Sequence, residues 1–225
     1  MNQPRLIGTL APRDPEGIVL VLHGGTAREG RPMVSPTQLS VLRMIPIARR
    51  IARTGGGRLA VFRLLNSRRG WDDQHTPVDD ATWALERVRE RYGDRPVSLV
   101  GHSLGGRAAL LAGAGESVRS VVALNPWVYP DETIELGGHP TLVVHGLADR
   151  VALPERSAAL ARRLAQTTDV GYIAIPGAGH AMLRHGRRFE SYATEFVTAT
   201  LLGRAGLALS EPVAAVLDGA AFVDG

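Results

Sequence analysis

The sequence predicts an α/β protein with a mostly parallel sheet of about six or more strands and helices on both faces. Short apolar runs rich in β-branched residues recur along the 225 residues, and segments with helical spacing separate them. Because the runs are nearly continuous and do not alternate with polar residues, they are typical of strands buried on both faces. The expected strands are residues 18–22, 59–65, 97–100, 118–124, 141–144 and 170–175.

Caps, apolar spacing and terminators predict the helices. Asp79 or Asp80 is expected to cap a helix that Gly93 ends. The other expected helices are residues 104–114, 154–164, 187–202 and 38–53, the last kinked or restarted at Pro46.

The chain is expected to form a single domain over residues 1–225, because it has no internal repeat and no long linker rich in Pro, Gly or Ser. Residues 203–225 are rich in alanine and lack a clear period. This segment is either a short packed helix or a loose tail, and the sequence leaves both open.

Composition excludes several classes of protein. With 44% hydrophobic residues the chain can bury a sizeable core, and with no cysteine it has no disulfide, thiolate metal site or cysteine nucleophile. All 26 basic residues are arginines, but they are spread among the acids and the net charge is only +4, so we expect no nucleic-acid partner. No apolar stretch reaches the roughly 18 residues of a membrane span, and the start resembles no signal peptide. We therefore expect a cytoplasmic protein with no membrane partner.

The strongest motif is Gly-His-Ser-Leu-Gly-Gly at residues 101–106, directly after an expected strand and before an expected helix. It fits G-x-S-x-G in the strand-turn-helix context that this motif requires. The turn is so sharp that Cβ atoms at the glycine positions would collide with neighbouring backbone. We expect Ser103 to be a nucleophile, exposed at a helix N-terminus whose dipole favours developing negative charge. The alternative is an ordinary tight turn.

A serine hydroxyl needs a base, and the base needs an acid to orient it. Asp149 follows the expected strand 141–144, and His180 follows the expected strand 170–175. All three side chains should therefore emerge at the carboxyl edge of one parallel sheet. The chain order Ser103, Asp149, His180 differs from the orders of chymotrypsin-like and subtilisin-like enzymes.

These motifs, in register over about residues 18–202, resemble those of small serine α/β hydrolases of the lidless esterase or thioesterase type. The resemblance implies an α/β-hydrolase domain with Ser103, His180 and Asp149 as its catalytic triad. The His-Gly-Gly-Thr run at residues 23–26 resembles the oxyanion loop of this family. One oxyanion amide is then that of Leu104, and the other is that of Gly25 or Thr26.

The remaining histidines have other expected roles. The side chain of His102 should point away from that of its neighbour Ser103, and His23 and His145 should be hydrogen-bonded supports. Surface or outer positions are expected for His75, His139 and His185. Spacings typical of metal sites and of nucleotide-binding loops are absent, so we expect no metal and no cofactor.

Less information is available for the substrate pocket. Arg68 or Arg69, in a loop after an expected strand, could meet an anionic substrate, or the loop is simply solvated with Trp71 packed inward. Trp127 and Tyr129 form pocket wall or merely cover the sheet. Only residues 125–140 separate the strand after the nucleophile helix from the next one, and sixteen residues are too few for a lid domain.

The sequence therefore predicts a cofactor-free serine hydrolase that cleaves small to medium acyl esters through an acyl-enzyme. Its partner is a small-molecule acyl substrate. A thioesterase or acyltransferase on the same triad is the alternative, and a non-catalytic binding protein on this fold is a third. The oligomeric state stays open.

Overall fold

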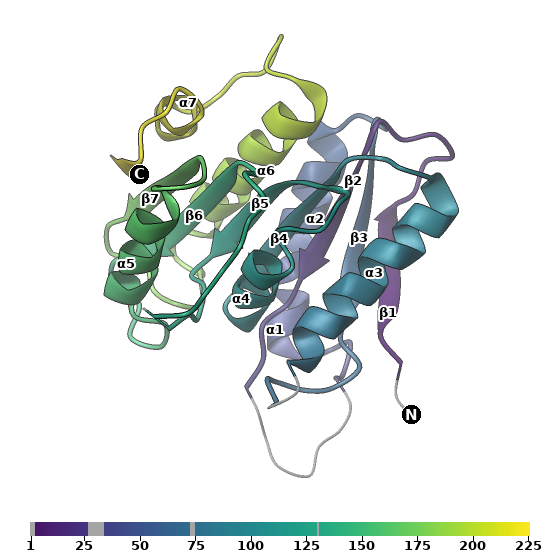
Figure 1. Cartoon of the computed structure of the whole chain (residues 1–225), viewed down its shortest axis with the longest axis horizontal. Helices are drawn as coiled ribbons and strands as arrows, with labels where there is room; N and C mark the ends of the chain where they lie inside the picture. Colours follow the sequence, from purple (N-terminus) through teal and green to yellow (C-terminus); the bar gives the residue numbers. More distant parts are fainter. Residues whose placement is uncertain (1–2, 27–33, 73–74, 130) are drawn as a thin grey trace.

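The computed structural model describes residues 3–26, 34–72, 75–129 and 131–225 (Figure 1). The strands form one sheet in the order β1-β3-β2-β4-β5-β6-β7-β8. The edge strand β1 runs antiparallel to β3, and all other neighbours are parallel, which confirms the predicted α/β class. The strands are β1 (Arg5–Leu10), β2 (Gly17–Leu22), β3 (Leu59–Leu65), β4 (Val97–His102), β5 (Val118–Leu124), β6 (Thr141–Gly146), β7 (Val170–Ile175) and β8 (Phe222–Asp224).

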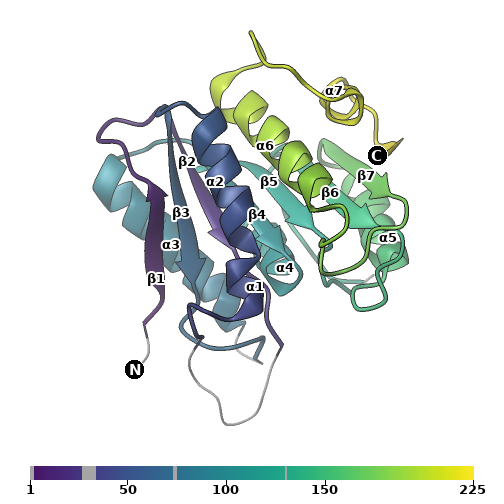
Figure 2. The same cartoon turned by 180° about the vertical axis from the view of Figure 1, so that it is seen from behind.

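Helices cover both faces of the sheet (Figures 1 and 2). One face carries α3 (Thr76–Tyr92), α4 (Leu104–Leu111) and α5 (Pro154–Leu164). The other carries α1 (Leu39–Leu42), α2 (Met44–Thr54), α6 (Gly186–Leu202) and α7 (Glu211–Leu217).

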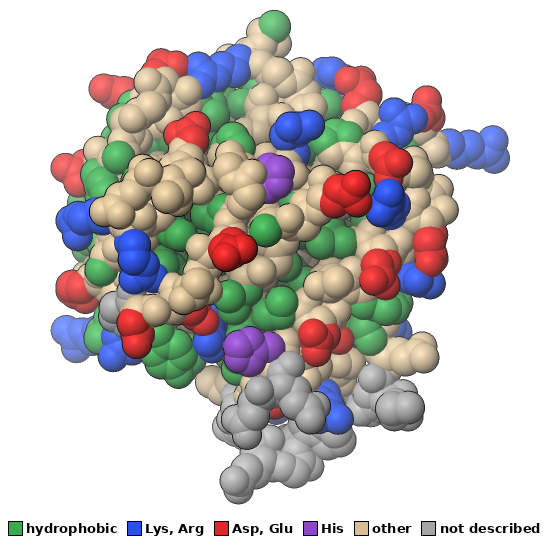
Figure 3. Space-filling model, viewed as in Figure 1, with side chains coloured by type: hydrophobic (Ala, Val, Ile, Leu, Met, Phe, Trp, Pro, Cys, Tyr) green, Lys and Arg blue, Asp and Glu red, His purple; other side chains and the backbone are tan. Residues whose placement is uncertain are grey.

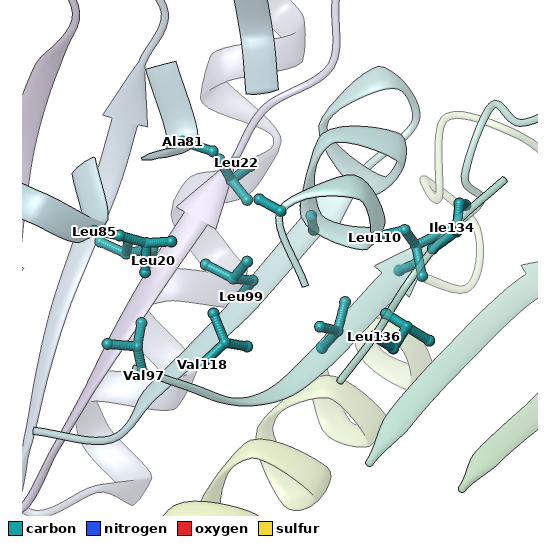
Figure 4. Packing of buried hydrophobic residues seen from close by; sticks show 14 of the residues in the cluster. Leu20, Leu22, Ala81, Leu85, Val97, Leu99, Leu110, Val118, Ile134 and Leu136 are labelled. Carbon is teal, nitrogen blue, oxygen red and sulfur yellow. The ribbon is translucent and has the colours of Figure 1, made fainter. Parts of the chain in front are cut away.

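The central strand β2 shows why its sequence is continuously apolar. Leu20 and Leu22 pack toward Leu85 and its neighbours on the α3 side (Figure 4), whereas Val19 and Val21 pack into the cluster on the α2 and α6 side. Each fully buried side chain of this size contributes on the order of 2 kcal/mol to folding. The buried core holds the carboxyl ends of the parallel strands at one edge, where the predicted site residues follow.

The start of α3 differs from the prediction. The helix begins at Thr76 with Pro77 in its first turn, so neither Asp79 nor Asp80 caps it. The carboxylate of Asp80 instead turns inward and accepts hydrogen bonds from the amide and the hydroxyl of Ser67, at 2.8 Å each. The prediction was wrong because a proline at the first helical positions is an equally good start signal.

The predicted restart near Pro46 is present. The helical segment breaks at Arg43, between α1 and α2, and Pro46 becomes the third residue of α2. At that position an amide would have no intrahelical acceptor, so the proline costs nothing there.

Both ends of the chain add strands that the sequence did not predict, β1 and β8. Within residues 203–225, left open by the sequence, the helix α7 packs on β7. Gly171 makes the close contact possible, because a Cβ atom there would lie 2.1 Å from a Val216 methyl carbon.

Residues 125–140, between β5 and β6, contain no helix or strand in their described part, so no lid domain is built there. No helix in the described ranges is both long and apolar enough to cross a membrane. On the face drawn in Figure 3, acidic and basic side chains are interspersed.

Candidate active site

Ser103 occupies the sharp turn between β4 and α4. A Cβ atom on Gly101 would lie 2.0 Å from the carbonyl oxygen of Gly105, and one on Gly105 would lie 2.5 Å from that of Leu22. Only glycine fits at either position. The backbone of Ser103 has φ 57° and ψ −121°, a conformation that L-residues adopt only where the surroundings enforce it. This strained turn holds the side chain out from the end of the sheet.

The three side chains predicted to act together do lie together. His180 Nε2 is 2.9 Å from Ser103 Oγ, and His180 Nδ1 is 2.7 Å from Asp149 Oδ2. The Ser103 hydroxyl can therefore donate to Nε2 while the N–H at Nδ1 donates to the carboxylate. Asp149 is buried and His180 is partly exposed, so the serine end of this chain of hydrogen bonds faces the open side.

Asp149 is held in its charged form. Burial alone would raise the pKa of its carboxyl, but hydrogen bonds from His145, His180 and the amide of Val151 keep the pKa well below its usual range. Oδ1 accepts the amides of Val151 at 2.8 Å and Ala152 at 3.0 Å. The carboxylate is thus fixed in place and ionised at neutral pH.

Two further side chains pin the backbone of His180. Its carbonyl oxygen accepts a hydrogen bond from His102 Nε2 at 2.9 Å and one from Asn125 Nδ2 at 3.2 Å. Asn125 also donates to the carbonyl of Gly179 and accepts the amide of Gly146, so it joins the ends of β5 and β6 to the loop that carries His180. The position of the imidazole is therefore set by contacts outside the three-residue chain.

His102, whose side chain was predicted to point away from that of Ser103, contacts the loop that carries His180. Its ring lies 5.0 Å from that of His180, centroid to centroid, and lines the cavity beside Ser103. Burial lowers the pKa of His102 to about 3, so the ring is neutral near pH 7. Its Nδ1 has no hydrogen-bond partner among the described residues.

The loop after β2 lies opposite the start of α4. His23 Nδ1 donates to the carbonyl of Gly24 at 2.6 Å, and its Nε2 accepts the amide of Asn66 at 3.2 Å. Because the peptide group is planar, the first bond also fixes the direction of the Gly25 N–H. Gly25, Thr26 and Leu104, the three predicted sources of oxyanion amides, all line the same cavity as Ser103.

Among the other histidines, His145 is a hydrogen-bonded support. Its Nε2 donates to the carbonyl of Ala152 at 2.9 Å, and its Nδ1 lies 2.7 Å from Ser157 Oγ. The residues lining the cavity do not include His75, His139 or His185.

The cavity at Ser103 has a volume of about 580 Å³. Of the five predicted pocket residues, four line it and Arg68 does not. Arg68 is exposed and lies 3.7 Å from Asp72, so of the two alternatives Arg68 and Arg69 only Arg69 lines the cavity. The described lining residues are Gly24, Gly25, Thr26, Gln38, Leu39, Ser40, Arg43, Arg69, Trp71, His102, Ser103, Leu104, Arg107, Trp127, Tyr129, Val151 and His180.

One wall of the cavity is an arginine held between aromatic rings. The guanidinium of Arg107 lies 4.0 Å from the ring centre of Trp71 and 4.9 Å from that of Tyr129. It is buried and ion-paired with Glu132, with Nη2 2.5 Å from Oε1. Trp127 packs edge-on against Tyr129 at 5.2 Å. These aromatic residues are therefore pocket wall and do more than cover the sheet.

Sequence reasoning missed Arg43, Arg107 and Asn125. A signal existed for two of them. Arg107 interrupts an otherwise apolar helical run, and Asn125 is a polar residue directly after a buried strand, the same signal that indicated Asp149 and His180. Arg43 carries no such signal, because an arginine is ordinary on a surface helix.

Within the described ranges, no group of three or more His, Asp or Glu side chains is placed to hold a metal ion.

Comparisons with known proteins bear on the fold. Residues 64–138, which include the turn at Ser103, match the family described as alpha/beta hydrolase fold. No curated protein matches the sequence well enough to count as a relative.

Solved structures resemble the chain over most of its length. An α/β serine hydrolase homologue from Coxiella burnetii is 16% identical with a TM-score of 0.66, covering 85% of this chain and 90% of its own. A serine hydrolase without a lid from Xanthomonas campestris is 17% identical with a TM-score of 0.62, and the match covers 86% of this chain and 93% of that one. A monoacylglycerol lipase from Paleococcus ferrophilus is 17% identical with a TM-score of 0.63, covering 88% and 99%. The chain therefore has the α/β-hydrolase fold.

Proposed function

We propose that this protein is a cofactor-free serine hydrolase that cleaves small to medium acyl esters through an acyl-enzyme on Ser103. The observation that carries the proposal is the unbroken series of hydrogen bonds from Ser103 through His180 to Asp149, at 2.9 and 2.7 Å, beside a cavity large enough for a substrate. The similar fold of a monoacylglycerol lipase supports an ester as the substrate.

In the first half of the reaction, Ser103 Oγ attacks the acyl carbon while its proton passes to His180 Nε2. The ionised Asp149 stabilises the imidazolium that results and keeps the ring in its productive orientation. His180 then gives the proton to the leaving alkoxide, which departs as the alcohol. The acyl group remains on Ser103.

In the second half, a water molecule takes the place of the alcohol. His180 removes its proton, the hydroxide adds to the acyl carbon, and the proton returns to Ser103 Oγ as the acid leaves. The negative charge on the carbonyl oxygen is stabilised by the amide of Leu104 and that of Gly25 or Thr26. Loss of one such donor typically costs on the order of 3 kcal/mol.

The thioesterase and acyltransferase alternatives use the same three side chains. A thioesterase would release a thiol in the first half, and an acyltransferase would use an acceptor other than water in the second. Measured activity on matched oxygen esters and thioesters, with and without an added alcohol, therefore separates them.

The test begins with a fluorophosphonate, which should modify Ser103 in wild-type protein and not in Ser103→Ala, as seen by peptide mapping. Initial rates on a series of 4-nitrophenyl esters and acyl thioesters, in the presence of EDTA, then rank the substrates. Absence of both labelling and turnover would make the chain a binding protein on this fold. Activity that chelation removes and a divalent ion restores would contradict the cofactor-free mechanism.

A further inference from the structure

We propose that the substrate of this site carries a negative charge, a carboxylate or a phosphate, which Arg43 and Arg69 bind in the cavity beside Ser103. The inference deepens the proposed function and rests on it. It assigns the class of ester that the cavity selects, and it assigns two residues that determine that selection.

The charge of the cavity wall is the first observation. Three arginines line the cavity, namely Arg43, Arg69 and Arg107, and no aspartate or glutamate is among its described lining residues. Asp149 lies behind His180 and is fully occupied by its hydrogen bonds. A ligand in this cavity therefore meets positive charge on several sides.

The three arginines are not equivalent. Arg107 is neutralised, because its Nε and Nη2 both bind Glu132 Oε1 and two aromatic rings cover the guanidinium. Arg43 and Arg69 have no ion pair with any acidic side chain in the part of the chain that the structure describes. Their charges are thus available to a ligand.

Arg69 also has an unused hydrogen-bond donor. Its Nε is buried and makes no hydrogen bond within the described residues. Leaving a buried donor of a charged group unpaired is costly, and a bound anion would supply the missing acceptor. Its neighbour Arg68 is exposed to solvent and forms an ion pair with Asp72.

The loop that carries Arg69 is held on both sides. At its start, Ser67 donates its amide and hydroxyl to the buried carboxylate of Asp80. Near its end, Asp72 accepts the amide of Thr76 at 2.8 Å, and the ring of Trp71 lies against Arg107. The guanidinium of Arg69 is therefore presented on a fixed backbone, which lowers the entropy cost of binding a ligand.

Arg43 approaches from a separate element, the junction between α1 and α2, and is half-buried. Burial lowers the pKa of its guanidinium, but an arginine remains charged at neutral pH. A partly desolvated charge with no acidic partner among the described residues is costly by itself, and an anionic ligand would offset that cost.

Guanidinium groups suit carboxylates and phosphates equally, because their paired N–H donors match two oxygens of either anion. The charged group can lie on the acyl side or on the alcohol side of the ester. The experiment therefore contains an arm for each side and for each anion.

Matched pairs of esters provide the first test on wild-type protein. On the acyl side, the 4-nitrophenyl half-ester of adipic acid is compared with 4-nitrophenyl hexanoate, which has the same chain length. On the alcohol side, the acetyl esters of 4-hydroxybenzoate and of 4-hydroxyphenyl phosphate are compared with phenyl acetate. After subtraction of spontaneous hydrolysis, kcat/KM should be higher for at least one charged ester by about tenfold to a hundredfold.

Variants provide the second test. In Arg69→Gln and in Arg43→Gln, the ratio of kcat/KM for the charged ester to that for its neutral partner should fall by about tenfold or more. The matched control is Arg68→Gln, which removes an arginine from the same loop outside the cavity and should leave the ratio unchanged. Circular dichroism and thermal melting establish that each variant is folded.

The outcomes separate this inference from the proposed function. Equal kcat/KM for every pair, in an enzyme that labels with fluorophosphonate and cleaves neutral esters, would overturn the inference and leave the hydrolase intact. If no ester is cleaved, calorimetric titration still tests the anion site. It measures the affinity of Ser103→Ala for the charged adipate half-ester and for the neutral hexanoate ester. Tighter binding of the charged ester than of the neutral ester, lost when Arg69→Gln is added, would support the anion site. Equal affinity for the two esters would overturn it.

Discussion

The two sides of the cavity differ in how completely their polar groups are paired. One side is formed by the ends of β4, β6 and β7, and we call it the triad side. There Asp149 accepts hydrogen bonds from the rings of His180 and His145 and from two amides, and hydrogen bonds to its ring and to its carbonyl oxygen hold His180. On the side formed by residues 66–72 and Arg43, which we call the pocket side, Arg69 Nε and Asn66 Oδ1 are buried without partners in the described chain.

This difference reflects what each side has to do. The chemistry of the triad side is the same for every ester, so its geometry can be complete before a substrate arrives. In our proposal the pocket side recognises one class of molecule, so some of its donors and charges are paired only when that molecule binds. Unpaired cationic groups beside the hydrogen-bonded series of Ser103, His180 and Asp149 therefore support the proposed class of substrate.

The largest expected effect is on the triad side. Ser103→Ala should lower kcat by about 10⁴-fold or more, because the remaining contacts can bind and polarise the ester but cannot form the acyl-enzyme. Binding of a charged ester should persist, since Arg43 and Arg69 are untouched. Stopped-flow burst kinetics and calorimetry measure the two quantities separately. Retention of wild-type turnover would remove Ser103 from the mechanism and with it the contrast between the two sides.

His102 is the exception on the triad side, because its buried Nδ1 has no hydrogen-bond partner among the described residues. The ring of His102 also makes the stability of the folded protein depend on pH. Because its pKa is lowered to about 3 in the folded protein and is near 6.5 when unfolded, the unfolded chain binds a proton first as the pH falls. Its contribution to stability is therefore complete above about pH 6.5 and is lost progressively as the pH falls toward 3. Between pH 7.5 and pH 4.5 this loss should be about 2–3 kcal/mol.

Urea unfolding at the two pH values measures this loss in wild type and in His102→Gln. The glutamine can still donate a hydrogen bond to the carbonyl of His180 but does not titrate. The variant should lose about 2 kcal/mol less than wild type over the same interval. An identical loss in both proteins would show that His102 is not the group responsible. His23, whose pKa burial also lowers, remains in both proteins and cancels.

The central sheet could be predicted from the sequence because its strands are buried on both faces. Continuous apolar runs as short as those of β2 and β3 are typical of buried strands and are shorter than most helices. The edge strand β1 is only half-buried and contains a glycine, and β8 has three residues, so neither has a hydrophobic pattern strong enough to predict it. Their pairing depends on the finished sheet.

The same distinction applies to the site. That Ser103, Asp149 and His180 lie together was predictable, because the proposed reaction dictates their residue types and the fold dictates their place in the chain. The choice between Arg68 and Arg69 was not, because adjacent loop residues have the same chemistry and only the path of the backbone decides which one faces the cavity. The contact of His102 with His180 likewise joins two residues that are 78 positions apart in the chain.

Asn125 tests whether the pairing on the triad side matters for rate. Asn125→Asp keeps the shape of the side chain and the acceptor for the Gly146 amide, but removes the donor to the carbonyl of His180. Aspartate also tolerates the positive φ of 41° at this position. We expect kcat to fall by about tenfold to a hundredfold through misplacement of the imidazole, with KM nearly constant.

Steady-state kinetics on one neutral ester gives the two constants, and the rate of fluorophosphonate labelling reports the reactivity of Ser103 directly. A loss of stability without a loss of labelling rate would mean that Asn125 only supports the fold. An increase in KM alone would mean that Asn125 acts in substrate binding, like the residues of the pocket side.

The smallest expected effect concerns acyl length. Each CH₂ that becomes buried in the cavity contributes about 0.8 kcal/mol, roughly a fourfold gain in kcat/KM. The cavity wall carries three arginines and few aliphatic side chains, and Leu39 at its mouth is 75% exposed. The gain should therefore stop early, so that esters from acetyl to hexanoyl rise in turn and lauroyl and palmitoyl esters gain nothing more.

A second cavity of about 310 Å³ adjoins this one and shares Leu39 and Arg43 with it. Most of its lining side chains are apolar, Met182 and Leu183 among them, and Glu190 lines it as well. If kcat/KM continued to rise through lauroyl and palmitoyl esters of the same alcohol, this neighbouring cavity would be the place where the chain is buried. In that case Leu183→Ser should remove the gain for long esters and leave acetyl esters unaffected. The pocket side would then select its substrate by apolar area as well as by charge.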